Sequence, residues 1–182
     1  YGPMGVGALY IRRDLQASIE PLIYGGGQQN NLRSGTLPTP LCVGMGAASV
    51  LLGNDDAACQ REHIAQMRDR FVTKLMNLPY PINLNGPPSG AMRHHGNANV
   101  RFDGFSAQDI LGALQPNIAA SSGAACASGI PEPSHVLRAI GLGHQEADAS
   151  IRFSLGRGTN EKMIEEAVSL IDDTLKECSA TV

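Results

Sequence analysis

One cysteine lies in a stretch of uniformly small residues, a setting that suits a reactive thiol on a loop. Every residue from Ala119 to Gly129 is Ala, Ser, Gly or Cys. Such side chains bury little apolar area, and Ser and Gly favour turns, so the stretch predicts a loop. Cys126 lies near its centre, and Pro131 and Pro133 prevent a helix from continuing. The thiol could act as a nucleophile, although the pattern also fits an inert cysteine packed as a small apolar residue.

Two other stretches carry groups that bind anions. Three glycines at residues 25–27 precede Arg33, Ser34 and Thr36. Glycines let backbone amides approach a phosphate, and hydroxyl groups donate to its oxygens, although an ordinary surface loop has the same composition. Arg152 lies in an alternating apolar and polar stretch that predicts a strand. Its planar guanidinium could bind a carboxylate with two hydrogen bonds, or form a surface ion pair.

The positions of the Cys, His and Lys residues predict neither a metal site nor a Schiff-base lysine. The four cysteines form no CxxC pair, so neither a zinc site nor a disulfide framework is predicted. The neighbouring His94 and His95 have no third ligand at suitable spacing, and we expect no metal. The three lysines, Lys74, Lys162 and Lys176, lie in charged helical stretches and are expected on the surface.

Composition excludes several classes of partner. The chain has 182 residues, 42% of them hydrophobic, which is enough for a core, and a net charge of −3 without a basic run. Binding to nucleic acid or to an anionic membrane is therefore not expected. No apolar stretch reaches the roughly 18 residues of a membrane-spanning helix, and no signal peptide is recognisable. We expect a reducing compartment, the cytoplasm or an organellar matrix.

Hydrophobic periodicity and turn residues predict a compact α+β unit after residue 80. In the last helix, Met163, Ala167, Leu170, Ile171 and Leu175 are expected to face inward. A change of composition near residues 53–56 predicts a boundary between domains 1–54 and 55–182. Strands are expected at residues 82–84, 97–102, 117–121 and 150–156, and residues 1–11 are expected to form a Gly/Pro turn that leads into a strand. Helices are expected at 39–52, 55–78, 106–114, 134–141 and 160–177, and a short turn at 144–148.

Four motifs, in order, resemble those of the cysteine desulfurases, which are pyridoxal-phosphate (PLP) enzymes of the class V aminotransferase group. They are the segments 1–10, 25–36, 121–139 and 150–157. The resemblance implies an α/β, PLP-dependent aminotransferase-like fold of fold type I. Residues 1–54 would then form the C-terminal part of the large PLP-binding domain. Residues 55–182 would form a connecting helix and a small α+β domain that carries the cysteine loop.

The resemblance also assigns roles to residues. It implies that Thr36, supported by Ser34 and Arg33, binds the cofactor phosphate of the neighbouring subunit in a homodimer. It implies that Arg152 binds the substrate α-carboxylate and that Cys126 accepts the sulfur. Two positions depart from the family pattern: Gln29 replaces a common Glu, and Ala124 replaces a common Ser. The family's Schiff-base lysine would lie two positions before Tyr1, so it is not in this sequence.

The implied activity is removal of sulfur from L-cysteine, giving L-alanine and a persulfide on Cys126. The cofactor would be PLP, and the sulfur would pass to an acceptor protein such as an iron–sulfur scaffold or a thiolation protein. Two alternatives are open at this stage. The substrate could be selenocysteine, as in selenocysteine lyase, or the chain could be a non-catalytic fragment or half-protein, inactive alone because it lacks the Schiff-base lysine.

Overall fold

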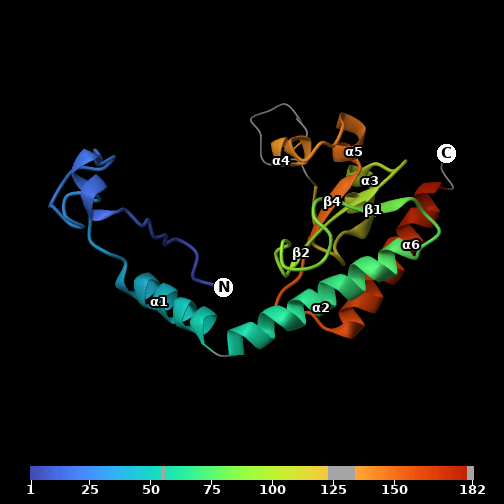
Figure 1. The fold of residues 1–182 in the computed structure, drawn as a ribbon, viewed down its shortest axis with the longest axis horizontal. Coiled ribbons are helices and arrows are strands. Elements are labelled where there is room, and N and C mark those ends of the chain that lie inside the picture. The colour runs from blue at the N-terminus through green and yellow to red at the C-terminus, as the bar shows by residue number, and fades with distance from the viewer. Residues whose placement is uncertain (55, 123–133, 180–182) are drawn as a thin grey trace. The chain divides into compact units, whose positions relative to one another are not determined.

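The computed structural model describes residues 1–54, 56–122 and 134–179, and the chain divides into two compact units, Tyr1–Ala57 and Ala58–Val182 (Figure 1). We call these unit 1 and unit 2. The boundary predicted from the sequence lies between residues 54 and 55, and the observed division follows Ala57. Helix α2 (Asp56–Met76) begins between these two points.

Unit 1 contains little regular structure. Apart from the first two residues of α2, its described elements are a 3-10 helix, η1 (Arg13–Ser18), and helix α1 (Thr39–Gly53), which was predicted at residues 39–52. The predicted strand at residues 1–11 is wrong, because this segment has no strand. Strands are held by hydrogen bonds to a neighbouring strand, and the described part of unit 1 contains none.

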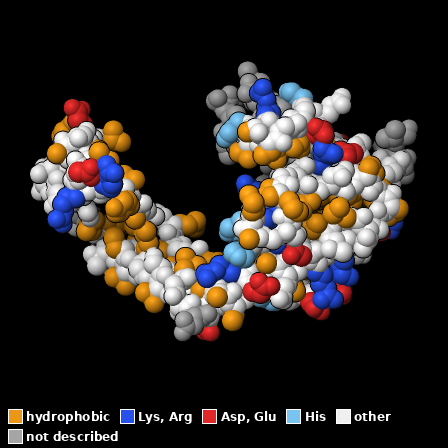
Figure 2. Space-filling model, in the orientation of Figure 1, with side chains coloured by type: hydrophobic (Ala, Val, Ile, Leu, Met, Phe, Trp, Pro, Cys, Tyr) orange, Lys and Arg blue, Asp and Glu red, His pale blue; other side chains and the backbone are white. Residues whose placement is uncertain are grey.

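Large apolar side chains are exposed over unit 1, and Figure 2 shows hydrophobic side chains spread along its surface. Met4 is 95% exposed and Leu22 is 98% exposed, and α1 contains no buried residue. Among the described residues of this unit, only Ser34 and Ala57 are buried. Since buried apolar area is the main stabilising contribution in a folded domain, unit 1 has no hydrophobic core of its own.

Unit 2 is built on an antiparallel sheet with the strand order β1-β2-β4-β3 (Figure 1). Two predicted strands are shorter than expected, since β3 and β4 keep only part of residues 117–121 and 150–156. After α2, the elements are β1 (Ile82–Leu84), β2 (Asn97–Phe102), α3 (Ala107–Leu114), β3 (Ser121–Ser122), α4 (His135–Ala139), α5 (His144–Asp148), β4 (Ser150–Ser154) and α6 (Glu161–Ser179).

The hydrophobic core lies on one face of this sheet. Burial alternates along β2, as a strand with one covered face requires. Phe71 of α2 meets Phe153 of β4 edge to face, with 5.1 Å between ring centroids. Helices α2 and α6 lie side by side in Figure 1, and the ion pair between Lys74 and Glu165 joins them at 3.6 Å. The helices therefore cover the apolar face, and the other face of the sheet is polar.

The predicted inward face of α6 is partly wrong. Ile171 and Leu175 are buried, as expected, but Met163 is 52% exposed and Leu170 is 36% exposed. Ile164 is buried instead. Residues 164, 171 and 175 follow one stripe of the helix, and Met163 and Leu170 each precede a member of it by one residue, about 100° around the axis.

None of the helices in the described ranges is both long and apolar enough to cross a membrane.

Candidate functional site

A pocket of about 740 Å³ lies on the polar face of the sheet in unit 2. Strands β2, β3 and β4, the loop after β1, and helix α4 all contribute to it. Its lining residues are Asn85, Gly86, Pro87, Arg93, Asn97, Asn99, Ser121, Ser122, Ser134, His135, Val136, Leu137, Ile140 and Arg152. Most of these residues carry polar side chains, and Arg152 adds a guanidinium group that suits a small anionic ligand.

Arg152 lies at the centre of the polar face. In the strand register it is opposite Asn99 of β2 on one side and Ser121 of β3 on the other. Its side chain is exposed, while those of Ile151 and Phe153 are buried, as the alternation predicted. Among the residues that the structure describes, no carboxylate pairs with Arg152. Its donors are therefore available to an anionic ligand.

Arg93, the second arginine of the pocket, is buried, and its donors are used within the protein. Nε donates to the Pro87 carbonyl at 2.8 Å, and the Nη2 group donates to the same carbonyl and to that of Asn85. Nη1 contacts the carbonyl and Oδ1 of Asn97 at 3.4 and 3.3 Å. Arg93 thus fixes the loop between β1 and β2 rather than binding a ligand.

A polar cluster beneath the same loop supports it from α2. Arg68, only 1% exposed, donates from Nε to Asp69 at 2.7 Å and from Nη1 to the His94 carbonyl at 3.1 Å. Ser89 donates to the same Asp69 oxygen at 2.6 Å. Burial raises the pKa of Asp69, but hydrogen bonds from Arg68 and Ser89, with the charges of Arg68 and Arg93, outweigh it and hold the pKa below its ordinary value.

Cys126 lies outside the described residues, within the segment 123–133. The described residues on either side of this segment, Ser122 and Ser134, both line the pocket that contains Arg152. The chain therefore enters and leaves the segment of Cys126 at this pocket.

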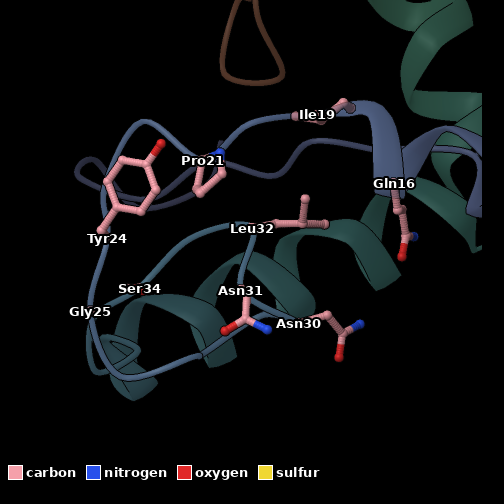
Figure 3. A pocket seen from close by; sticks show the side chains of 9 residues that line it. All are labelled: Gln16, Ile19, Pro21, Tyr24, Gly25, Asn30, Asn31, Leu32 and Ser34. Atoms are coloured by element: carbon pink, nitrogen blue, oxygen red, sulfur yellow. The ribbon is translucent and has the colours of Figure 1, made fainter.

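A smaller pocket, of about 350 Å³, lies in the Gly-rich part of unit 1 (Figure 3). Figure 3 shows Tyr24, Asn31 and Leu32 among the side chains that line it. Ser34 is 5% exposed, and its backbone N–H donates to the Ile23 carbonyl at 3.4 Å. Of the three residues predicted to bind phosphate, only Ser34 lines this pocket.

The backbone of this Gly-rich loop adopts unusual conformations. Gln29, Asn30 and Asn31 have φ values of 57°, 57° and 63°, in the left-handed region that L residues rarely adopt. Gly25 packs against Ser34, because a Cβ on this glycine would lie 3.1 Å from the Ser34 Cβ. Sparsely populated conformations persist only where surrounding contacts hold them, and they occur often at binding sites.

The donors of this loop suit a phosphate group. The Arg33 guanidinium donates to the Ser34 carbonyl, which holds it beside the hydroxyl-bearing residues. Thr36 is exposed, and within the described ranges its hydroxyl has no hydrogen-bond partner. A guanidinium and two hydroxyl groups within four residues form a donor set that fits phosphate oxygens.

None of the three lysines lines either pocket, and each forms an ion pair with a carboxylate. Lys74 pairs with Glu165, Lys162 with Glu166 at 3.6 Å, and Lys176 with Asp172 at 2.7 Å. The described residues also contain no group of three His, Cys, Asp or Glu side chains that could hold a metal ion.

Comparison with known proteins identifies the family. A family model described as aminotransferase class-V matches residues 1–166. The chain belongs to the class-V aminotransferase family. It is 44% identical over 171 residues to the cysteine desulfurase IscS of Rickettsia prowazekii, a match that covers 94% of this chain and 41% of the relative. This class-V aminotransferase chain therefore spans about two fifths of the length of that curated relative.

Solved structures agree with this assignment. A NifS-like protein superimposes with a TM-score of 0.81 and 28% identity, covering 96% of this chain and 43% of that protein. The structure of SspA in complex with cysteine superimposes with a TM-score of 0.59 and 35% identity, covering 86% and 41%. The predicted resemblance to the cysteine desulfurases and the predicted fold of the PLP-dependent aminotransferases are both confirmed.

Sequence reasoning did not single out Asn99 or Arg93. A signal for Asn99 was present, because Asn97, Asn99 and Arg101 alternate with apolar residues in β2 and must share its polar face. Arg93 could not have been found in this way, since it lies in an irregular loop.

Proposed function

We propose that this chain is part of a PLP-dependent cysteine desulfurase, which removes sulfur from L-cysteine and leaves L-alanine. One observation carries the proposal: Arg152, which has no carboxylate partner among the described residues, lines the same pocket as Ser122 and Ser134, and these two residues flank the segment of Cys126. A carboxylate-binding group and the chain entry to a thiol at one pocket are what this reaction needs. The similarity to cysteine desulfurases supports the same reading.

The cofactor proposed for this enzyme is PLP, which serves as an electron sink for the substrate when bound. Thr36, Ser34 and Arg33 would hold its phosphate, with Thr36 reaching the site of a second subunit in a homodimer. The three lysines of this chain are engaged with carboxylates on helices α2 and α6. The Schiff-base lysine would therefore lie outside residues 1–182, and we expect residues 1–182 alone to be inactive.

Two residues of this chain would act on the substrate, one by holding its carboxylate and the other by accepting its sulfur. Arg152 would hold the α-carboxylate of L-cysteine with its guanidinium fork. The Cys126 thiolate would attack the substrate sulfur, so that a sulfur–sulfur bond forms and the substrate carbon–sulfur bond breaks. In balance, L-cysteine and the thiol give L-alanine and a persulfide. Cys126 lies four residues after Ser122, a chain length that reaches at most about 14 Å from the pocket wall.

A persulfide formed in this way must be passed on. We propose that it is transferred to the thiol of an acceptor protein, such as an iron–sulfur scaffold. Because every residue from Ala119 to Gly129 is Ala, Ser, Gly or Cys, an acceptor thiol could approach the persulfide without displacing large side chains from these positions.

The test is to replace Cys126 by Ser in the PLP-loaded protein and to incubate it with L-cysteine. Intact-mass measurement should show the addition of one sulfur atom to the parent protein and none to the variant. Cofactor absorbance should be unchanged, because the substitution leaves the phosphate-binding residues intact.

Cys59→Ser is the matched control, since Cys59 is an exposed cysteine on α2. This variant should form the persulfide at the parent rate. Persulfide formation by Cys126→Ser at the parent rate would exclude Cys126 as the sulfur acceptor.

A further inference from the structure

Asn99 lies beside Arg152 in the sheet and lines the same pocket. The two residues are directly opposite in the register of β2 and β4, so their side chains emerge on the same face. Cβ atoms of directly opposite residues in antiparallel strands are about 4.5–5.5 Å apart. The two side chains therefore start from neighbouring positions at one pocket, so that a single ligand could contact both.

A chain of hydrogen bonds fixes which atom of Asn99 faces inward. The Ser150 hydroxyl donates its hydrogen to the Glu146 carbonyl at 2.6 Å, so it must accept from Asn85, whose Nδ2 lies 2.8 Å away. The same Asn85 Nδ2 group donates to Oδ1 of Asn99 at 2.7 Å. Asn85 itself is buried, and its backbone N–H donates to the Asn99 carbonyl at 2.9 Å.

This arrangement determines what Asn99 offers to the pocket. Its Oδ1 is occupied by Asn85, so the Nδ2 group, with two N–H donors, is left for a ligand. Within the described part of the chain, that Nδ2 group has no acceptor. In the other amide of β2 in the pocket, Asn97, Oδ1 accepts from Arg93 Nη1 at 3.3 Å, but Asn97 is opposite Ser154 in the register and not opposite Arg152.

We propose that Asn99 is a second substrate-binding residue, whose Nδ2 group donates a hydrogen bond to the carboxylate that Arg152 binds. The inference rests on the proposed function for the identity of the substrate. A carboxylate has two oxygens with about four lone-pair directions, so it can accept from both residues at once. The combination of one charged fork and one amide donor selects an α-carboxylate over a ligand that lacks one.

The substitution that tests this is Asn99→Asp in the full protein. It keeps an oxygen for the Asn85 amide and the shape of the side chain, but replaces the free donor with an acceptor that repels a carboxylate. We expect KM for L-cysteine to rise at least about tenfold with a smaller change in kcat. Asn83→Ala is the control, because Asn83 lies on β1, outside the pocket, and bonds Asp103. It should leave KM unchanged.

A second measurement uses the unsubstituted protein and does not depend on catalysis. The ¹H–¹⁵N signals of the Asn99 side-chain amide are followed during titration with L-alanine, and separately with ethylamine, which lacks the carboxylate. The signals should shift with L-alanine and stay in place with ethylamine.

The outcomes separate this inference from the proposed function. If L-alanine shifts the Arg152 Nε signal but not the Asn99 amide, the inference is wrong and the proposed function stands. If the Asn99 amide shifts but the protein forms no persulfide, the inference stands and the proposed function is wrong. If L-alanine shifts neither residue, or if ethylamine shifts Asn99 equally, Asn99 is not a carboxylate ligand.

Discussion

Two guanidinium groups lie beside one pocket, and their hydrogen bonds give them different roles. The donors of Arg93 are used on backbone and side-chain oxygens of one loop, and burial, together with the nearby Arg68, lowers its pKa. Arg152 is exposed and unpaired within the described residues. Burial and donor count thus separate a structural arginine from one that can bind a ligand.

Replacing Arg152 by Gln should weaken use of L-cysteine. Loss of a charged hydrogen bond to the carboxylate costs about 1.5–3 kcal/mol, so kcat/KM should fall about 10- to 150-fold, mainly through KM. Arg152→Lys should recover only part of this loss, because Lys keeps the charge but not the fork. Steady-state alanine formation measures the effect. Arg138→Gln, on the exposed surface of α4, serves as the control, and an unchanged KM in Arg152→Gln would contradict the assignment.

Gly96 is the last residue of the loop between β1 and β2, which we call the pocket loop, and its position leaves no room for a side chain. A Cβ at this position would overlap the Leu155 carbonyl oxygen and approach Ile64 Cγ2 at 3.3 Å. Leu155 also donates from its N–H to the Gly96 carbonyl at 2.8 Å, so the backbone cannot move apart without losing this bond. Gly96→Ala should therefore reduce the free energy of unfolding by about 3 kcal/mol.

Urea unfolding of the two alanine variants Gly96→Ala and Gly112→Ala gives the comparison. Gly112 lies in α3 with open space around its Cα, so alanine there should stabilise the protein by about 0.5–1 kcal/mol through helix propensity. Equal unfolding free energies for both variants would mean that the approach of Leu155 to Gly96 is not a tight constraint.

At the scale of elements, α2 supports the pocket loop through Asp69. Hydrogen bonds and nearby charges lower the pKa of Asp69 despite burial. The ionised Asp69 therefore stabilises the folded state fully above the unfolded-state pKa of about 3.9. This stabilisation is lost as the pH falls through the lower folded-state pKa. Asp69→Asn should cost about 1–2 kcal/mol at pH 7, less than for a fully buried pair, since the Asp69 side chain is 43% exposed.

The measurement is urea unfolding of the parent and of Asp69→Asn from about pH 2 to about pH 8. This range extends well below and well above the ordinary pKa values of carboxyl groups. The difference should be constant above about pH 5 and shrink below about pH 4. Asp173→Asn is the control, because this exposed carboxylate pairs with Lys176 on the surface and should contribute less than about 0.5 kcal/mol. A difference that persists unchanged to pH 2 would rule out titration of Asp69 as its source.

Elements with strong local signals were predictable from the sequence, and long-range ones were not. The helix expected at residues 106–114 forms as α3, and Ser106 caps it: its hydroxyl accepts from the Asp109 N–H at 3.3 Å. A cap of this kind depends only on neighbours in sequence. The alternation that marks Arg152 as polar and outward is equally local. The strand expected at residues 1–11 failed because strand formation requires a partner that sequence pattern alone does not supply. The hydrogen bonds of Asn99 and Arg93 depend on the fold of residues 85–99.

At the scale of the whole molecule, the two units differ in how they are stabilised. Unit 2 buries a continuous cluster, including Phe71, Phe102 and Phe153, between its sheet and helices. Unit 1 exposes its large apolar side chains and relies on local hydrogen bonds. Buried apolar area resists local opening, so the two units should open with very different free energies.

Limited digestion of chain 1–182 with trypsin should reveal this difference. Cleavage after Arg12, Arg13 and Arg33 in unit 1 should be at least about tenfold faster than cleavage after Arg93, which is buried and fully hydrogen-bonded. Trypsin is the appropriate protease because residues 123–133 contain no Lys or Arg, so cleavage there cannot obscure the comparison. Mass spectrometry of timed samples identifies the sites. Cleavage after Arg93 as fast as cleavage after Arg33 would mean that the core of unit 2 does not protect its pocket loop.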